Sequence, residues 1–234
     1  MNISSFTLFR SLSLALAAAG ALSGVASTQA EIIASYAGSL GLNTTTGVIA
    51  PSDWSDHALQ PSNLTPSAGL FGSGNQSNGE AYYGGWDSTL TLEKYVSFTV
   101  AAESGYILNL TDFSFRTLPR TINGPVTSYT WGYRVNEGAG FGGWTLAHIY
   151  TDADSNYTSP FAKPWDFADF STTGTVEFGL FATTDSAVND MVSVRTAVLN
   201  GTVTAVPEPS TYALVGLGLL GALVVYRRRL SASV

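Results

Sequence analysis

The chain has 234 residues and a formal net charge of −7, and only 12% of its residues are charged. It contains no cysteine, which excludes a disulfide scaffold, a thiolate zinc site and a cysteine nucleophile. One of the 17 acidic and four of the ten basic residues lie outside segment 31–205, which leaves 16 acids against 6 bases, a net charge of −10. Such a balance repels phosphate backbones, so we expect no nucleic-acid partner.

Residues 1–30 have the three parts of a secretory signal peptide. Arg10 precedes an apolar run from Leu12 to Ala26, and Ala30 is a small residue suited to cleavage. We therefore predict export through the Sec machinery and removal of residues 1–30. Cleavage after Ala26 and an uncleaved first membrane helix are the alternatives.

Segment 31–205 reads as one extracytoplasmic β domain. Apolar and polar residues alternate with a period of two in several stretches, and Gly, Ser, Asn, Thr and Pro separate them. The alternating stretches are 95–100, 106–110, 112–118, 126–135, 144–150, 175–183 and 191–205. We predict an all-β fold, an antiparallel jelly-roll-like β-sandwich. Residues 51–80 are less regular and fit a surface loop or two short edge strands.

The same alternation predicts which side chains face the core. In each of three strands, the apolar residues lie an even number of positions apart, which is the spacing of one face of a sheet. These residues are Val96, Phe98 and Val100; Val176, Phe178, Leu180 and Ala182; and Val192, Val194 and Val198. We also expect a break in the last strand at Asn200–Gly201.

The C-terminus combines a proline motif, an apolar stretch and a basic cluster. The motif is Val206, Pro207, Glu208, Pro209, Ser210 and Thr211, and the cluster is Arg227, Arg228 and Arg229. The apolar stretch 212–226 has 15 residues, or about 22 Å as a helix, short for a hydrocarbon core of roughly 30 Å. We predict a single C-terminal transmembrane helix with its arginines in the cytoplasm and segment 31–205 on the outer side. A helix buried in the globular core is the alternative.

In this order and spacing, residues 206–229 resemble the PEP-CTERM sorting domain. The resemblance implies a Gram-negative bacterium that makes exopolysaccharide, and cleavage by an exosortase, a membrane-embedded transpeptidase-like enzyme. It implies that Glu208 and its flanking prolines are recognised as substrate. Stretches 95–100, 110–115 and 198–203 are similar to the body of other PEP-CTERM proteins, which implies a jelly-roll-like sandwich similar in outline to carbohydrate-binding modules.

Trp54 and Trp86 are the candidate carbohydrate contacts. Each lies in a stretch rich in turn residues with an acid next to it, Asp53 and Asp87. A flat indole can stack on the apolar face of a sugar ring, and a carboxylate can accept hydrogen bonds from its hydroxyls. The alternative for both tryptophans is packing, because aromatic side chains bury large areas.

The sequence offers little for a metal or for catalysis. Asp152, Asp154 and Asn156 begin like a calcium loop, but Tyr157 and Lys163 stand where an EF-hand needs Gly and Glu, so we predict no EF-hand, no metal and no cofactor. No nucleophile elbow, zinc-protease motif or phosphate loop occurs. A looser calcium site remains an alternative.

We therefore expect a protein that is not an enzyme. It would be an exported, exosortase-processed structural or interaction protein of the cell surface or of an exopolysaccharide-rich biofilm matrix. A lectin-like carbohydrate-binding module is the alternative. A secreted hydrolase is a second alternative, and it would need two of the carboxylates, such as Glu103, Glu137 and Glu177, to converge in one cleft.

Overall fold

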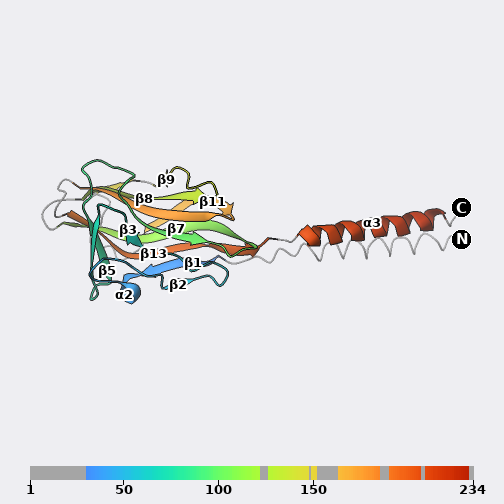
Figure 1. The fold of residues 1–234 in the computed structure, drawn as a ribbon, viewed down its shortest axis with the longest axis horizontal. Helices are drawn as coiled ribbons and strands as arrows, with labels where there is room; N and C mark the ends of the chain where they lie inside the picture. Colours follow the sequence, from blue (N-terminus) through green and yellow to red (C-terminus); the bar gives the residue numbers. More distant parts are fainter. Residues whose placement is uncertain are drawn as a thin grey trace. The chain divides into compact units, whose positions relative to one another are not determined.

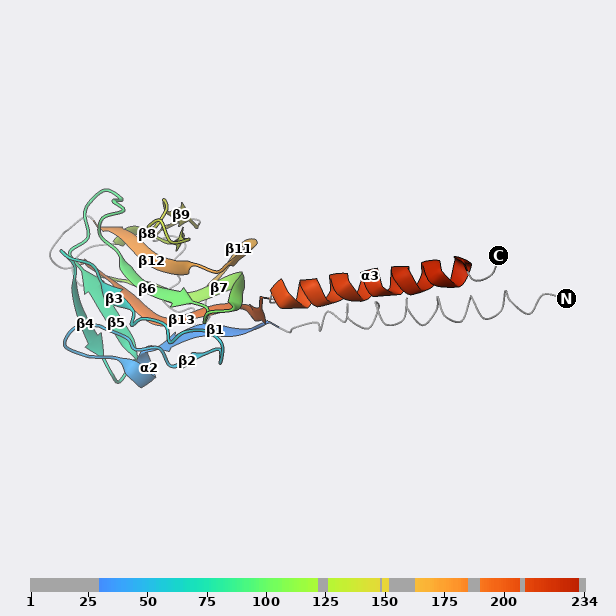
Figure 2. The same ribbon diagram turned by 45° about the vertical axis from the view of Figure 1, so that its right-hand side comes forward.

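The computed structural model describes residues 30–121, 126–147, 149–151, 163–184, 190–206 and 209–231. The described residues of segment 31–205 form two antiparallel sheets, one of seven strands and one of six, which confirms the prediction of an all-β sandwich. Figures 1 and 2 show the two layers, with β13 and β1 in one and β8 and β12 in the other.

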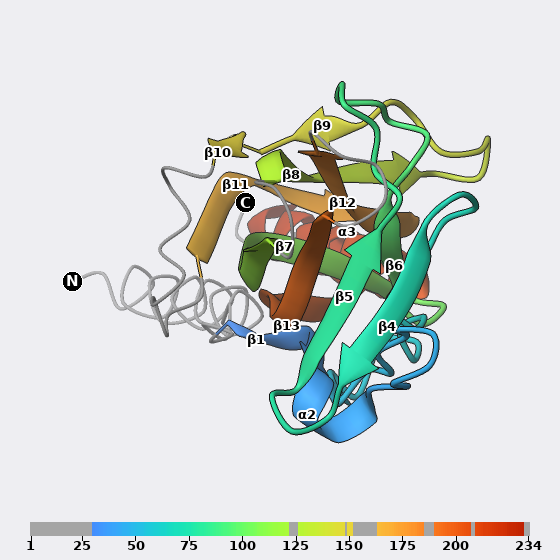
Figure 3. The ribbon, with the colours of Figure 1, turned by 90° about the vertical axis from the view of Figure 1, so that its left-hand side faces the viewer.

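The seven-stranded sheet is organised around its longest strands. Its members are β1 (Glu31–Ala37), β2 (Asp53–Trp54), β4 (Phe71–Asn75), β5 (Glu80–Gly84), β7 (Tyr106–Thr121), β11 (Lys163–Thr172) and β13 (Asp190–Ala205). The order is β11-β7-β13-β1-β2. Strand β13 pairs with β7 on one side; on the other it pairs first with β5 and then with β1. Strand β4 pairs with β5 in a two-stranded ribbon, and Figure 3 shows both strands along their full length.

The six-stranded sheet has β12 at its centre. Its members are β3 (Thr65–Pro66), β6 (Val96–Ala101), β8 (Val126–Asn136), β9 (Thr145–Leu146), β10 (Tyr150–Thr151) and β12 (Thr175–Thr184). The order is β10-β8-β12-β6-β3, and β9 also pairs with β8. A single helical turn, α2 (Gly38–Gly41), follows β1.

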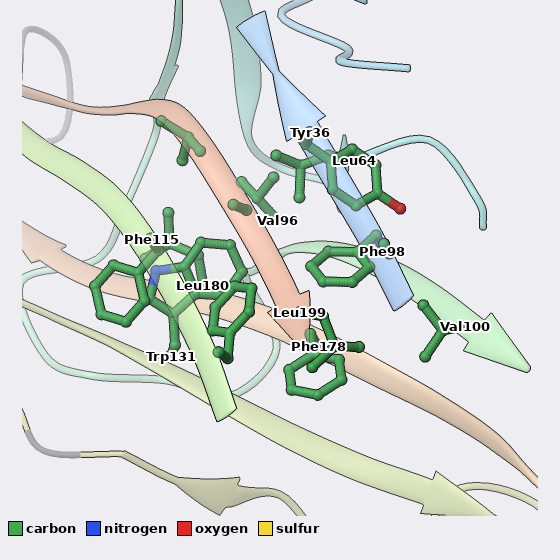
Figure 4. Packing of buried hydrophobic residues seen from close by; sticks show 14 of the residues in the cluster. Tyr36, Leu64, Val96, Phe98, Val100, Phe115, Trp131, Phe178, Leu180 and Leu199 are labelled. Carbon is green, nitrogen blue, oxygen red and sulfur yellow. The ribbon is translucent and has the colours of Figure 1, made fainter. Parts of the chain in front are cut away.

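Aromatic side chains from both sheets fill the space between the layers. Phe98 stacks on Phe178 with ring centroids 5.4 Å apart, and the Trp131 indole packs edge-on against Phe113 at 4.9 Å. Figure 4 shows Phe98, Trp131 and Phe178 in this cluster. The positions predicted to face the core in β6 and β12 all belong to the buried core cluster, which confirms this prediction. Burial alternates along β6, whereas every residue of β12 after Thr175 is buried.

The last strand departs from its predicted pattern at a β-bulge. Val194 and Thr196 lie opposite adjacent residues of β7, so Arg195 is an extra residue in β13. The bulge reverses the alternation: Leu199 is fully buried, whereas Val198 is only partly buried. The prediction that Val198 continues the core face of Val194 is therefore wrong, because a period-two pattern does not survive an inserted residue.

The prediction that the last strand breaks at Asn200–Gly201 is also wrong, because the structure has a register shift there and no break. Strand β13 runs on to Ala205, and only its register against β7 shifts there. Asn200 lies opposite Asp112 and Gly201 opposite Leu110, so Thr111 is the extra residue. The irregularity is a bulge in the neighbouring strand rather than an end of β13.

The short strands and the strands at the sheet edges were the least predictable part. The structure places β2, β3, β4 and β5 within or just beyond segment 51–80, whereas the sequence indicated two short strands at most. The predicted strand 144–150 consists of the two-residue strands β9 and β10, and strand β11 was not predicted. A strand paired on one side carries a weaker alternating pattern, because only part of its surface is buried.

The C-terminal helix α3 spans Pro209–Ser231 and begins three residues before the apolar stretch. Proline suits the first turn of a helix, because its missing N–H would have no intrahelical partner there. Among the residues described, no helix is long and apolar enough to cross a membrane. The prediction of a helix is confirmed, and that of a membrane span is not. Residues 1–29 lie outside the described residues, so the signal peptide stays a prediction.

Candidate functional site

The end of β13 leads straight into the sorting segment. Ala205 pairs with Tyr106 at the start of β7, and the Val206 N–H donates to the Gly105 carbonyl at 2.8 Å. Val206 is 40% exposed. The folded domain therefore extends through Val206 with no linker before Pro207.

Three of the remaining motif residues belong to the C-terminal helix. Pro207 and Glu208 lie outside the described residues. Pro209, Ser210 and Thr211 form the first turn of α3. Residues Arg227, Arg228 and Arg229 lie near the other end of the same helix, where Arg227 and Arg228 are exposed.

The turn between β6 and β7 contains Gly105, whose carbonyl accepts the hydrogen bond from Val206. Gly105 has a φ of +87°, which L side chains rarely adopt and which favours glycine at this turn. The Tyr106 N–H donates to the Glu103 carbonyl at 3.0 Å, and the Glu103 N–H donates to the His57 carbonyl at 3.0 Å. The turn is thus closed by a hydrogen bond from the first residue of β7 and supported by the loop that contains His57.

His57 and Tyr106 cover this turn with stacked rings. Their centroids are 4.3 Å apart and their planes differ by 13°. His57 Nδ1 lies 3.8 Å from Glu103 Oε2, and both side chains are about half exposed (52% and 46%). His57, a loop residue in the sequence, thus supports the end of the domain where the sorting segment begins.

The first residue of the folded domain lies at this same end. Glu31 pairs with Gly201, and its Oε1 accepts hydrogen bonds from Ser55 Oγ at 2.9 Å and from the Val203 N–H at 3.3 Å. The predicted signal-peptide boundary and the start of the sorting segment therefore adjoin the same strand end.

The two candidate sugar-binding tryptophans have different environments. Trp54 lies on edge strand β2 and is 38% exposed, with Asp53 exposed beside it. Trp86 is 1% exposed, and its Nε1–H donates to the Tyr83 carbonyl at 2.8 Å. A ring buried in the core cannot stack on a sugar, so the prediction of a carbohydrate contact at Trp86 is wrong, and packing explains this residue.

A second aromatic group, not singled out by sequence analysis, covers the outer face of the six-stranded sheet. The Arg134 guanidinium lies 4.4 Å from the Trp144 ring centroid, 4.9 Å from that of Phe141 and 5.5 Å from that of Tyr95. Arg134 also forms an ion pair with Glu177 at 2.6 Å. Only the glycine-rich loop before Trp144 hinted at this cluster, because residues that meet across strands have no fixed spacing in the sequence.

The carboxylates considered for hydrolysis each have a separate partner. Glu177 pairs with Arg134, Glu137 Oε1 accepts a hydrogen bond from Thr172 Oγ1 at 2.5 Å, and Glu103 faces His57. The described part of the chain contains no group of three or more His, Asp or Glu side chains that could hold a metal ion. Segment 152–156, considered as a calcium loop, lies outside the described residues.

Comparison with known proteins identifies the C-terminal segment. A family model of the PEP-CTERM protein-sorting motif matches residues 205–229, which confirms the resemblance, so the chain carries a PEP-CTERM motif. No curated protein matches the chain.

One solved structure with limited similarity is CBM32-3 from a family 31 glycoside hydrolase of Clostridium perfringens. It is 18% identical, with a TM-score of 0.32, over 53% of this chain and 76% of that one.

Proposed function

We propose that this protein is exported, processed by an exosortase and delivered to the cell surface or the extracellular exopolysaccharide matrix as a structural or interaction protein. The PEP-CTERM motif at residues 205–229 carries the proposal. It begins at Ala205, the last residue of β13, so the cargo is one folded β domain joined directly to its sorting segment.

The C-terminal segment has the physical character of a temporary anchor. Segment 212–226 is apolar but contains Gly216, Gly218 and Gly221, which weaken its hydrophobicity, and Arg227 follows at once. In this proposal the arginines stay on the cytoplasmic side while the β domain lies outside, and the enzyme acts between the two. The mature protein then lacks the apolar segment and Arg227 to Arg229, with its new end near residues 206–212.

Intact mass of the extracellular form from the native host tests this proposal. We expect the loss of the apolar segment in the wild type and reduced release of Glu208→Ala. Glu93→Ala, which removes an exposed glutamate far from the motif in the sequence, is the control and should be released normally. A surface form that retains Arg229, or equal release of the Glu208 and Glu93 variants, would contradict the proposal.

A second candidate function, carbohydrate binding, rests on Trp54 alone. Its indole is 38% exposed, and the neighbouring Asp53 carboxylate could accept sugar hydroxyls. Affinity electrophoresis in the producer's own polysaccharide should retard the wild type and not Trp54→Ala. Phe71→Ala is the control, because it removes another exposed aromatic ring (43%) from β4. Equal mobility of the three proteins would exclude this function. Neither candidate function includes a catalytic step.

A further inference from the structure

The last residues of β13 are held from several directions. Thr202 to Ala205 pair with Asn109 to Tyr106 of β7. The Asn109 side-chain amide donates to Thr202 Oγ1 at 3.3 Å and to Thr204 Oγ1 at 3.0 Å. On the opposite edge, the Val203 N–H donates to Glu31 Oε1. The strand is therefore tied to its neighbours up to its last residue.

The β6–β7 turn extends this hydrogen-bonded segment by one residue, Val206. The Val206 N–H donates to the Gly105 carbonyl, and the turn itself is supported by the Glu103 N–H bond to His57 and by the stacked ring of Tyr106. Peptide-cleaving enzymes act on chain that is not hydrogen-bonded to neighbouring strands. Each peptide bond from Thr202 to Val206 is therefore exposed to cleavage only when this end of β13 opens locally, and it is protected because such opening is rare.

On the basis of the proposed function, we propose that the β6–β7 turn is a positioning element that makes Val206 the upstream limit of processing. Glu103, Gly105 and Tyr106, with His57, hold the chain so that the processing enzyme reaches only the residues after Val206. The site of cleavage then depends on the folded domain as well as on the proline motif. Loosening the turn would let the enzyme reach bonds on the amino side of Val206.

Two matched glycine variants isolate this turn. Gly105 and Gly138 both have left-handed φ angles, +87° and +103°, and a Cβ built on either would meet nothing within 4 Å. Alanine therefore introduces a similar backbone strain at both positions, without a clash. Gly105→Ala disturbs the turn that holds Val206, whereas Gly138→Ala disturbs the turn after β8.

Amide hydrogen exchange of the full-length chain tests, independently of processing, whether the β6–β7 turn holds the Val206 N–H in its hydrogen bond to the Gly105 carbonyl. We expect protection at the Val206 amide, relative to the Phe178 amide in β12, to fall roughly tenfold in Gly105→Ala, as the strain of a left-handed alanine predicts. It should stay near the wild-type ratio in Gly138→Ala. An equal ratio in the two variants, or an unprotected Val206 amide in the wild type, would overturn the proposal.

Intact mass of the released protein tests the consequence. In the wild type and in Gly138→Ala, every new C-terminus should lie after Val206, whereas Gly105→Ala should add termini before it. A wild-type end before Val206, or the same set of ends in both variants, would overturn the positioning role. If none of the proteins is processed, the proposed function fails. The exchange experiment still decides whether the β6–β7 turn protects the Val206 amide.

Discussion

The Trp144 indole lies over Gly179, so that a β-carbon at position 179 would stand 2.7 Å from Trp144 Cη2. Gly179 is paired in register with Gly132, where a β-carbon would stand 2.8 Å from Leu146 Cδ2. Two adjacent strands of the six-stranded sheet thus lack side chains at the same level of its outer face. Trp144 and Leu146 fill that space, which joins the 137–147 loop to the sheet.

Gly179→Ala should destabilise the domain, although alanine usually stabilises a strand relative to glycine. Its methyl group would meet Trp144, and overpacking of this kind costs about 1–3 kcal/mol. Urea unfolding followed by tryptophan fluorescence measures the loss. Gly143→Ala is the control, because its β-carbon would meet nothing within 4 Å and its φ is not left-handed. Equal stability of the two variants would contradict the contact.

Glu177→Gln should lower the free energy of unfolding by about 2 kcal/mol, because it removes the charge from a largely buried ion pair. The Glu177 and Arg134 side chains are 9% and 22% exposed, and Ser97 Oγ also donates to Glu177 Oε1 at 2.8 Å. In the control Glu80→Gln, the amide keeps an oxygen that can accept the hydrogen bond from the Tyr82 hydroxyl, and the charge lost lies 3.9 Å from Arg195, which is 38% exposed. We therefore expect a cost of less than about 1 kcal/mol. Denaturant titration of both variants compares them. A larger loss in Glu80→Gln would show that the Arg134 pair adds little.

Trp86→Ala should cost about 3–5 kcal/mol, the usual effect of removing a buried aromatic side chain. It also leaves the Tyr83 carbonyl without the indole N–H that reaches it. Trp54→Ala should cost less than about 1 kcal/mol, because its ring is 38% exposed on an edge strand. Thermal unfolding of the two variants measures the difference. Similar melting temperatures would place Trp86 outside the core.

Asp87 should make stability depend on pH at the acidic end. Its pKa is lowered chiefly by a hydrogen bond from Lys94 Nζ (2.6 Å), while desolvation, the second-largest effect, raises it. The charge of Lys94 and a hydrogen bond from Thr91 lower the pKa further, so the net shift is downward. The stabilisation is therefore complete above the unfolded pKa of about 3.9 and is lost as pH falls through the lower folded value. The urea midpoints of wild type and Asp87→Asn should differ at neutral pH and converge below about pH 4. The urea midpoint of Lys94→Met should likewise approach that of the wild type as the pH falls through the same range. A difference that persists at the lowest pH would contradict the assignment.

Much of the sandwich could be predicted from the sequence, because a strand buried on one face repeats its apolar residues with a period of two. Strands β6 and β12 follow this pattern, and their predicted inward residues form the core. The sorting segment could also be identified from the sequence, since its proline motif, apolar stretch and arginines are contiguous in the chain.

The tertiary structure decided what depends on contacts between distant residues. The extra residue Arg195 in β13 moves the core face of that strand from Val198 to Leu199, and no local pattern in the sequence predicts where a strand will bulge. Trp54 and Trp86 look alike in the sequence, yet only Trp54 remains exposed, because burial depends on which strands pack over a loop. The hold on Val206 likewise comes from Gly105, far away in the chain, which reaches it only because β7 and β13 pair antiparallel.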